Sequence, residues 1–196
     1  MRPGRYMVVI TAVVLCPLTA WAEPLVLRLL PDKTQLTFTV KATGHAIDGA
    51  MALASGEIRF DTDTGAASGE VTIDLRRAGT GNRLRDHEMH SSVLESEQYP
   101  VASFRPGRVV GSLARSGSSE LMLAGILGFH GVDHSLTLPV QVIVAGDTVV
   151  AATAIDIPYV AWGLRNPSLL FLRVAPIATV SLKTEGSLLQ LNAVRR

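Results

Sequence analysis

Apolar and polar residues alternate along most of the chain. In the segment TQLTFTVKAT at residues 34–43, Leu36, Phe38 and Val40 alternate with threonines and a lysine. The segment VTIDL at residues 71–75 repeats the pattern. A period of two is typical of β-strands with one buried face, because successive side chains point to opposite faces. We therefore predict strands at both places.

Turn-forming clusters of Asp, Gly and Ser separate further runs of this kind, which is the pattern of antiparallel hairpins. One segment differs, because residues 82–98 are polar with apolar residues at helical spacing, and this predicts a short helix between two strands.

Roughly eight antiparallel strands in one domain favour a closed barrel or a sandwich, and closure leaves no exposed strand edge. The further runs occupy residues 50–60, 101–110, 120–127, 135–144, 148–160 and 172–182.

The composition bears on how such an interior is filled. Aromatic residues make up only 5% of the sequence. An eight-stranded barrel is either packed with its own side chains or holds one small ligand. Composition leaves both outcomes open, and it predicts small residues along the wall of any cavity. The alanines that we expect to face inward are Ala50, Ala52, Ala54, Ala102, Ala124, Ala152 and Ala154.

The N-terminus has the layout of a secretory signal. Two arginines precede an apolar run at residues 8–15, and an Ala-x-Ala cleavage pattern ends at Ala22. We expect residues 1–22 to be a signal peptide and residues 23–196 to form one periplasmic or secreted domain. The apolar run is shorter than the roughly 20 residues of a spanning helix, so no stable membrane span is expected after cleavage. A short uncleaved anchor is the alternative.

Charge and cysteine content exclude several function classes. The chain carries 18 Lys and Arg against 17 Asp and Glu, a formal net charge of +1, without a basic stripe. A nucleic-acid-binding surface needs clustered cations, so we predict no nucleic-acid partner. Cys16 is the only cysteine and falls within the predicted signal. The exported domain would therefore have neither a disulfide nor a cysteine nucleophile.

Familiar catalytic motifs are absent from the sequence. It contains no Gly-x-Ser-x-Gly elbow, no phosphate-binding glycine loop and no His-Glu-x-x-His motif. We therefore predict no cofactor, no metal and no enzymatic activity. In one alternative, His87 and His90 share a helix face and bind a metal ion together with Glu88 or His45. Histidines in this arrangement are more often exposed or hydrogen-bonded within the fold.

Two polar clusters stand out. Arg83-Leu84-Arg85-Asp86 places two arginines and an acid at the expected start of the helix, where they either bind an anion or cap the helix. The segment WGLRNPS at residues 162–168 places Trp162 and Arg165 in a predicted loop between two strands. That loop is either part of a barrel mouth or a plain turn.

The order of several segments resembles the YceI-like family of bacterial secreted proteins. The segments are TQLTFTV, GEIRFDTDTG, GEVTIDL, RDHEMHSSVLESEQYPVASF and AGILGFHGVDHSLTLPV, and the resemblance covers residues 30–187. It implies an all-β fold, an eight-stranded antiparallel lipocalin-like barrel with a short helical insert. It also implies a periplasmic binding protein, not known as an enzyme, that holds an isoprenoid chain such as a polyprenyl or quinone lipid inside the barrel.

The resemblance and the strand pattern together give a set of candidate site residues. Arg85 and Asp86 match the family's Arg-Asp pair, which positions the helix or touches a lipid headgroup. We predict that the apolar ligand contacts are Phe38, Val40, Phe60, Phe104 and Trp162, and that the headgroup or mouth residues are Arg85, Asp86 and Arg165. A one-residue error in the register of a strand would turn its predicted ligand contacts to the outer face of the barrel.

The expected partner is therefore an isoprenoid or other long-chain lipid. Two alternatives stay open: a metal-dependent envelope enzyme using His87 and His90, and a ligand-free envelope interaction protein with a filled barrel. The sequence leaves the oligomeric state open, and a homodimer is compatible with it.

Overall fold

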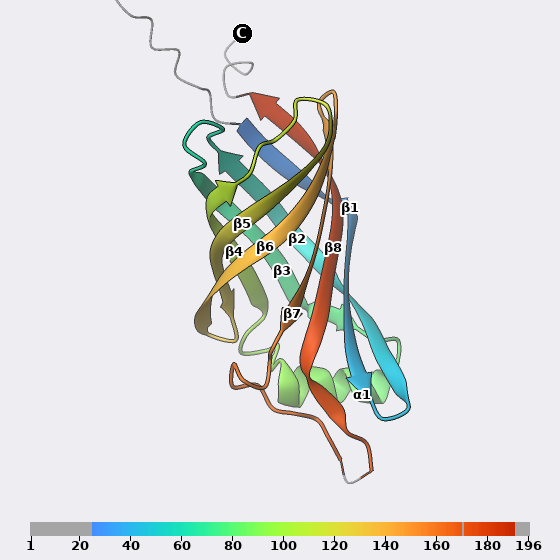
Figure 1. Cartoon of the computed structure of the whole chain (residues 1–196). Helices are drawn as coiled ribbons and strands as arrows, with labels where there is room; N and C mark the ends of the chain where they lie inside the picture. The colour runs from blue at the N-terminus through green and yellow to red at the C-terminus, as the bar shows by residue number, and fades with distance from the viewer. Residues whose placement is uncertain (1–24, 170, 191–196) are drawn as a thin grey trace, which may run out of the picture.

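Eight strands form a closed antiparallel barrel in the computed structural model, which describes residues 25–169 and 171–190 (Figure 1). Each strand pairs with its neighbour in sequence, and the last strand pairs with the first. The predicted fold class is therefore confirmed. The strands are β1 (Leu25–Ala42), β2 (His45–Phe60), β3 (Ala67–Gly79), β4 (Val101–Val110), β5 (Gly117–Phe129), β6 (Val132–Ala145), β7 (Thr148–Ile157) and β8 (Val174–Gln190).

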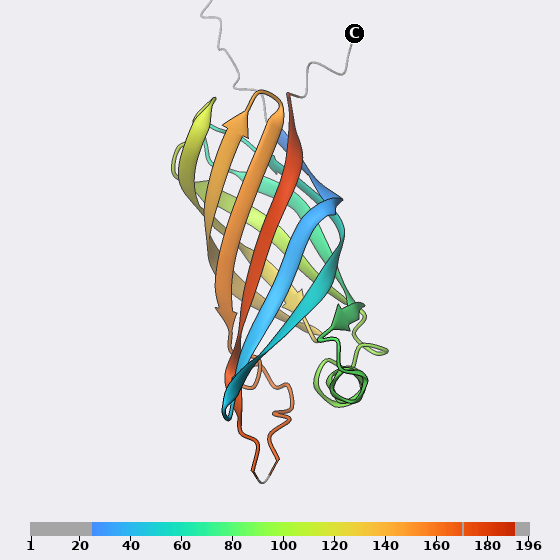
Figure 2. The same cartoon turned by 90° about the vertical axis from the view of Figure 1, so that its right-hand side faces the viewer.

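The barrel is elongated, and its two ends differ in construction (Figures 1 and 2). The upper end in Figure 1 carries the tight turns at residues 61–66, 111–116 and 146–147. The lower end carries the turn at 43–44, the helical segment between β3 and β4, the turn at 130–131 and the long β7–β8 loop at 158–173. We use "upper end" and "lower end" for these two sets of connections.

The helical segment at the lower end consists of α1 (Arg83–Glu88) and a π-helical turn, η1 (Met89–Val93). The side-chain oxygen of Asn82 accepts hydrogen bonds from the backbone N–H groups of Leu84 and Arg85, both at 3.1 Å. Asn is a favoured N-cap residue because its side chain satisfies amide groups that have no partner within the helix. The short helix predicted within residues 82–98 is confirmed.

The upper end is closed by a small apolar cluster of Leu121, Val142, Val144 and Val149. Val144 and Val149 are 2% and 1% exposed, and they face each other across the β6–β7 ladder. Burial of this kind stabilises a fold because apolar surface is removed from water. The cluster therefore closes the upper end, and three of its residues, Leu121, Val142 and Val149, also line a small cavity below it.

The alanine prediction is wrong for six of its seven positions, because only Ala102 lines an interior cavity. In β7, Ala151, Thr153 and Ile155 line the cavities, whereas Ala154 lies in the outward register and is exposed. Leucines and valines therefore form most of the wall. Their inward register follows from the alternation of side chains along a strand.

The predicted signal peptide at residues 1–22 lies outside the described residues. Within the described part of the chain, no helix has the length and apolar character needed to cross a bilayer.

Candidate ligand-binding site

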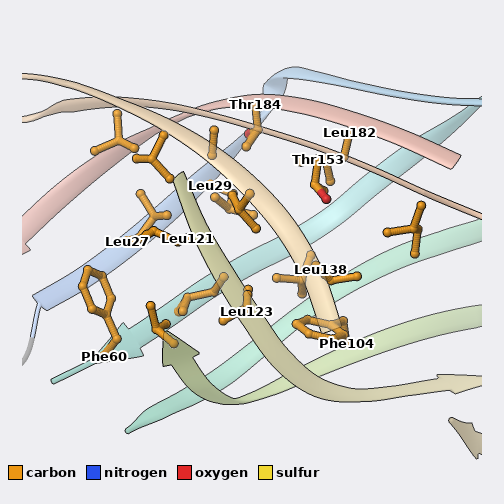
Figure 3. A pocket seen from close by; sticks show the side chains of 18 of the residues that line it. Leu27, Leu29, Phe60, Phe104, Leu121, Leu123, Leu138, Thr153, Leu182 and Thr184 are labelled. Atoms are coloured by element: carbon orange, nitrogen blue, oxygen red, sulfur yellow. The ribbon is translucent and has the colours of Figure 1, made fainter. Parts of the chain in front are cut away.

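The barrel interior contains two cavities. The upper cavity has a volume of about 170 Å³, and leucines from several strands point into it (Figure 3). The lower cavity has a volume of about 600 Å³. Both cavities are bordered by the same four apolar residues, Ile73, Leu127, Ile155 and Val180, so they are adjacent spaces separated by a narrow apolar waist.

The lower cavity is covered by the helical segment and the β7–β8 loop. Met89 and Val93 line it from η1, while Leu164 and Leu172 line it from the loop. The remaining wall comes from strands of the barrel. A cavity of this size and apolar lining is within the range typical of small-molecule sites.

Polar groups on the wall of the lower cavity are confined to the lower end of the barrel. The β7–β8 loop contributes Tyr159, whose hydroxyl donates to the Ala175 carbonyl at 2.8 Å. The other polar lining residues come from the start of β2 and from the segment that leads into α1 and forms it: His45, Thr80, Asn82, Arg85 and Glu88. The upper cavity offers only apolar surface. We call this polar end of the lower cavity, beside the helical segment, the mouth. An amphiphile would therefore find apolar surface within the barrel and hydrogen-bonding groups at the mouth.

A hydrogen-bond network fixes the orientation of Arg85. Its Nε donates to the Thr80 hydroxyl at 2.7 Å, and its Nη2 donates to the Thr80 carbonyl at 3.3 Å. The backbone N–H of Thr80 in turn donates to Asp86 at 2.8 Å, and the Thr80 hydroxyl donates to the same carboxylate. These Thr80 hydrogen bonds lower the pKa of Asp86, because they favour the charged carboxylate. The Arg85 guanidinium has five N–H donors, so it keeps donors for a ligand.

The structure separates the sequence-predicted contacts into three groups. Phe38, Val40 and Arg85 line the lower cavity, and Phe60 and Phe104 line the upper one. The other three residues line neither cavity. They are Asp86, which holds Thr80, and Trp162 and Arg165, which lie in the loop over the mouth. Whether any of the eight touches a ligand stays a prediction.

Trp162 and Arg165 make contacts that hold the β7–β8 loop on the barrel. The Trp162 ring stacks on His134 of β6, with ring centroids 3.9 Å apart, and meets Phe129 edge-on at 6.3 Å. Arg165 forms an ion pair of 3.6 Å with Glu88 of α1. Because Phe129 and Glu88 both line the lower cavity, these contacts join the loop to the cavity wall.

Of the two histidines of the helical segment, His90 has a structural role. The Ser96 hydroxyl lies 2.8 Å from Nδ1 of His90, and Nε2 of the same ring lies 2.9 Å from the Ala78 carbonyl. Both ring nitrogens of His90 are thus occupied, while His87 is exposed. In the described part of the chain, no group of three His, Cys, Asp or Glu side chains is arranged to bind a metal ion. The metal-enzyme alternative gains no support from this geometry.

The sequence interpretation missed the apolar residues of the cover. Met89 of η1 and Leu164, Leu169 and Leu172 of the β7–β8 loop line the lower cavity. The signal available in the sequence was the run Leu169-Leu170-Phe171-Leu172 within a segment otherwise typical of a loop. Period-based reasoning assigns such a run to the next strand, and it therefore placed a strand start at residue 172.

Two solved structures have the same fold. BcnA of Burkholderia cenocepacia has a TM-score of 0.65 at 18% identity, covering 80% of this chain and 98% of its own. A polyisoprenoid-binding domain from Saccharophagus degradans, implicated in plant cell wall breakdown, has a TM-score of 0.65 at 16% identity, covering 82% and 97%. A comparison with curated proteins finds no match.

The family comparison agrees with the fold and covers most of the sequence. The YceI-like domain matches residues 27–186, from the first strand of the barrel to the last. That range includes the helical segment, the β7–β8 loop, all residues that line the lower cavity and all but Leu188 of those that line the upper one. The chain therefore belongs to the YceI-like domain family.

Proposed function

We propose that this protein binds a long apolar chain, an isoprenoid lipid or a quinone, inside its barrel. The observation that carries the proposal is the lower cavity of about 600 Å³, which is apolar along the barrel and polar only at its mouth. A second apolar cavity adjoins this one at the four shared lining residues, and a chain longer than the lower cavity would extend in that direction. The solved relative named as a polyisoprenoid-binding domain supports this class of ligand.

The binding energy would come mainly from burial of hydrocarbon. Each CH₂ group removed from water contributes about 0.8 kcal/mol, so a chain of several isoprene units needs few polar contacts for tight binding. The polar groups at the mouth would set the direction of the chain. Arg85 is the best placed of them, because it lines the cavity and Thr80 holds its guanidinium in one orientation.

We also propose that the protein acts as an exported binding protein and not as an enzyme. Support for export comes from the N-terminal sequence, in which the apolar run and the pattern ending at Ala22 predict cleavage. Expression of the full chain in a Gram-negative host, followed by fractionation and mass measurement, tests this. A periplasmic product that starts at Glu23 is expected, and an uncleaved membrane-associated product would contradict it.

Native mass spectrometry of residues 23–196, purified from the expressing cells, tests the binding proposal. Organic extraction of the bound material is expected to yield a lipid of isoprenoid mass. A matched incubation of the delipidated protein with a polyprenol, a quinone and a saturated fatty acid would rank the ligand classes. A protein of apo mass that takes up none of the three would reject the proposal and favour a ligand-free interaction protein.

A further inference from the structure

The most exposed large hydrophobic side chains gather at one end of the barrel. Phe171 is 93% exposed, Leu84 is 85% exposed and Leu169 is 73% exposed, the three highest values for large hydrophobic residues in the described part of the chain. Phe171 and Leu169 lie in the β7–β8 loop, where the backbones of Leu169 and Leu172 are hydrogen-bonded to each other, and Leu84 lies on α1. Leu84 and Leu169 also line the lower cavity, so the apolar surface continues from the cavity out to the solvent.

Cations accompany these apolar tips. Lys41, Arg83 and Arg173 are exposed at the lower end, and none of them has an ion-pair partner among the described residues. The backbone of Arg173 is fixed, because its N–H donates to the Thr43 hydroxyl at 3.0 Å. The lower-end connections also carry the exposed acid Glu97, which forms no ion pair among the described residues, so unpaired cations exceed the unpaired acid around the protruding hydrophobic side chains.

The turns of the upper end carry no comparably exposed large hydrophobic side chain among the described residues. Their exposed charged residues are of both signs, Asp63 and Asp147 with Arg115. The two ends therefore differ mainly in their exposed hydrophobic side chains, which at the lower end stand beside basic residues without an ion-pair partner in the described part of the chain. Apolar side chains next to basic ones are the combination that binds the interface of an anionic bilayer.

We propose that the lower end docks on the surface of an anionic lipid bilayer. Phe171, Leu169 and Leu84 enter the interfacial region, while Arg83 and Arg173 lie at the level of the phosphates. In this orientation the mouth of the lower cavity faces the lipid, and an apolar chain can pass between bilayer and barrel without crossing water. The proposal rests on the proposed function only for the identity of the cargo.

A bilayer fits this surface better than a protein partner does. The three hydrophobic side chains are 73–93% exposed, so each protrudes from its loop or helix, whereas a protein interface typically has a packed apolar core within a polar rim. Such projections insert into a fluid interface without needing a shaped complement. The basic residues around them match the negative surface potential of anionic lipids.

Vesicle flotation of residues 23–196 tests the proposal. Vesicles of phosphatidylcholine mixed with phosphatidylglycerol are compared with vesicles of phosphatidylcholine alone, neither containing a prenyl lipid. The wild-type protein is expected to float with the mixed vesicles and more weakly with the neutral ones. The double variant Leu169→Ser/Phe171→Ser should bind the mixed vesicles about tenfold or more weakly, because it loses interfacial burial.

Two further variants separate charge from apolar insertion. Arg83→Gln/Arg173→Gln should weaken binding to the mixed vesicles by about fivefold per charge and leave binding to neutral vesicles unchanged. The matched control is Val110→Ser at the upper end, where an exposed apolar residue is removed far from the mouth, and it should bind like the wild type.

The result that overturns docking is a wild-type protein that floats with neither vesicle, or a Leu169→Ser/Phe171→Ser variant that floats like the wild type. Binding of the soluble prenol farnesol, measured without vesicles, reports on the proposed function separately. If the protein floats but does not bind farnesol, docking stands and the isoprenoid proposal fails. If it binds farnesol but does not float, the isoprenoid proposal stands and docking fails.

Discussion

The two ends of the barrel are closed in different ways. At the upper end, tight turns join the strands, and Asp61 accepts hydrogen bonds from the backbone N–H groups of Asp63 at 2.8 Å and Thr64 at 2.9 Å. Beneath these turns lies a packed cluster of valines and leucine. At the lower end, a helical segment and a long loop cover a cavity of about 600 Å³. The upper end is built to hold the barrel together, and the lower end to admit a ligand.

The difference between the two ends is tested most severely by a charged residue in the apolar cluster of the upper end. Val144→Asp should lower the free energy of unfolding by about 3–5 kcal/mol, because an unpaired carboxylate would be buried at a position that is 2% exposed. Urea denaturation provides the measurement. Its matched control is Ile143→Asp, one residue earlier in β6 and 51% exposed on the outer face. Equal stability of the two variants would show that the upper end is not the stabilising one.

Filling the lower cavity should affect binding without a comparable loss of stability. Ala178→Phe places a ring in the cavity, whereas Ala154→Phe places the same ring on the exposed face of β7. If the ring displaces about three CH₂ groups of a bound chain, affinity should fall roughly 50-fold. Competitive titration with a polyprenol measures the change. Equal affinities in the two variants would place the ligand elsewhere.

The polar mouth should contribute less than the apolar wall. Arg85→Ala is expected to weaken binding of an isoprenyl phosphate by about tenfold, the scale of one hydrogen bond to a charged group. Arg165→Ala should have little effect, because Arg165 lines neither cavity. Binding of the uncharged prenol serves as the internal reference. If both variants bind the isoprenyl phosphate as tightly as the wild type, neither arginine contacts the headgroup.

The smallest effect concerns the start of the helix that covers the cavity. Because the pKa of Asp86 is lowered in the folded protein, the carboxylate stabilises the fold above its ordinary titration range near pH 4. That contribution is lost as the pH falls through the lowered pKa. Asp86→Asn should therefore destabilise the protein at neutral pH by about 0.3–1 kcal/mol, the scale of a charge in the first helical turn. A difference in stability that persists unchanged at pH 2 would contradict this account.

The sequence predicted the strands best where the alternation of side chains is uninterrupted. Residues 101–110 match β4 at both ends. By contrast, β1 begins at Leu25, nine residues before the predicted start. The pairing of β1 with β2 shifts register between Arg28 and Leu36, and a shift of this kind interrupts the period of two.

The candidate site could be predicted only in part. Phe38 and Val40 alternate with polar neighbours along β1, so their inward direction was readable from the sequence, and both line the lower cavity. Trp162 lies in a loop without a period, and its stacking on His134 depends on tertiary contacts. The alanines of β2 and β7 were assigned to the wrong face because apolar residues occupy both registers of these strands.

The seam between β1 and β8 has a consequence for how the protein is made. Leu27 pairs with Leu188, so the barrel is closed by strands from the two extremes of the described sequence. During synthesis, β1 stays without its second partner strand until β8 has been made. Until then β1 and β7 present unpaired edges, which are templates for intermolecular pairing. Folding is therefore expected to be slow compared with a helical protein of the same size, and a chain that stops before residue 174 should aggregate.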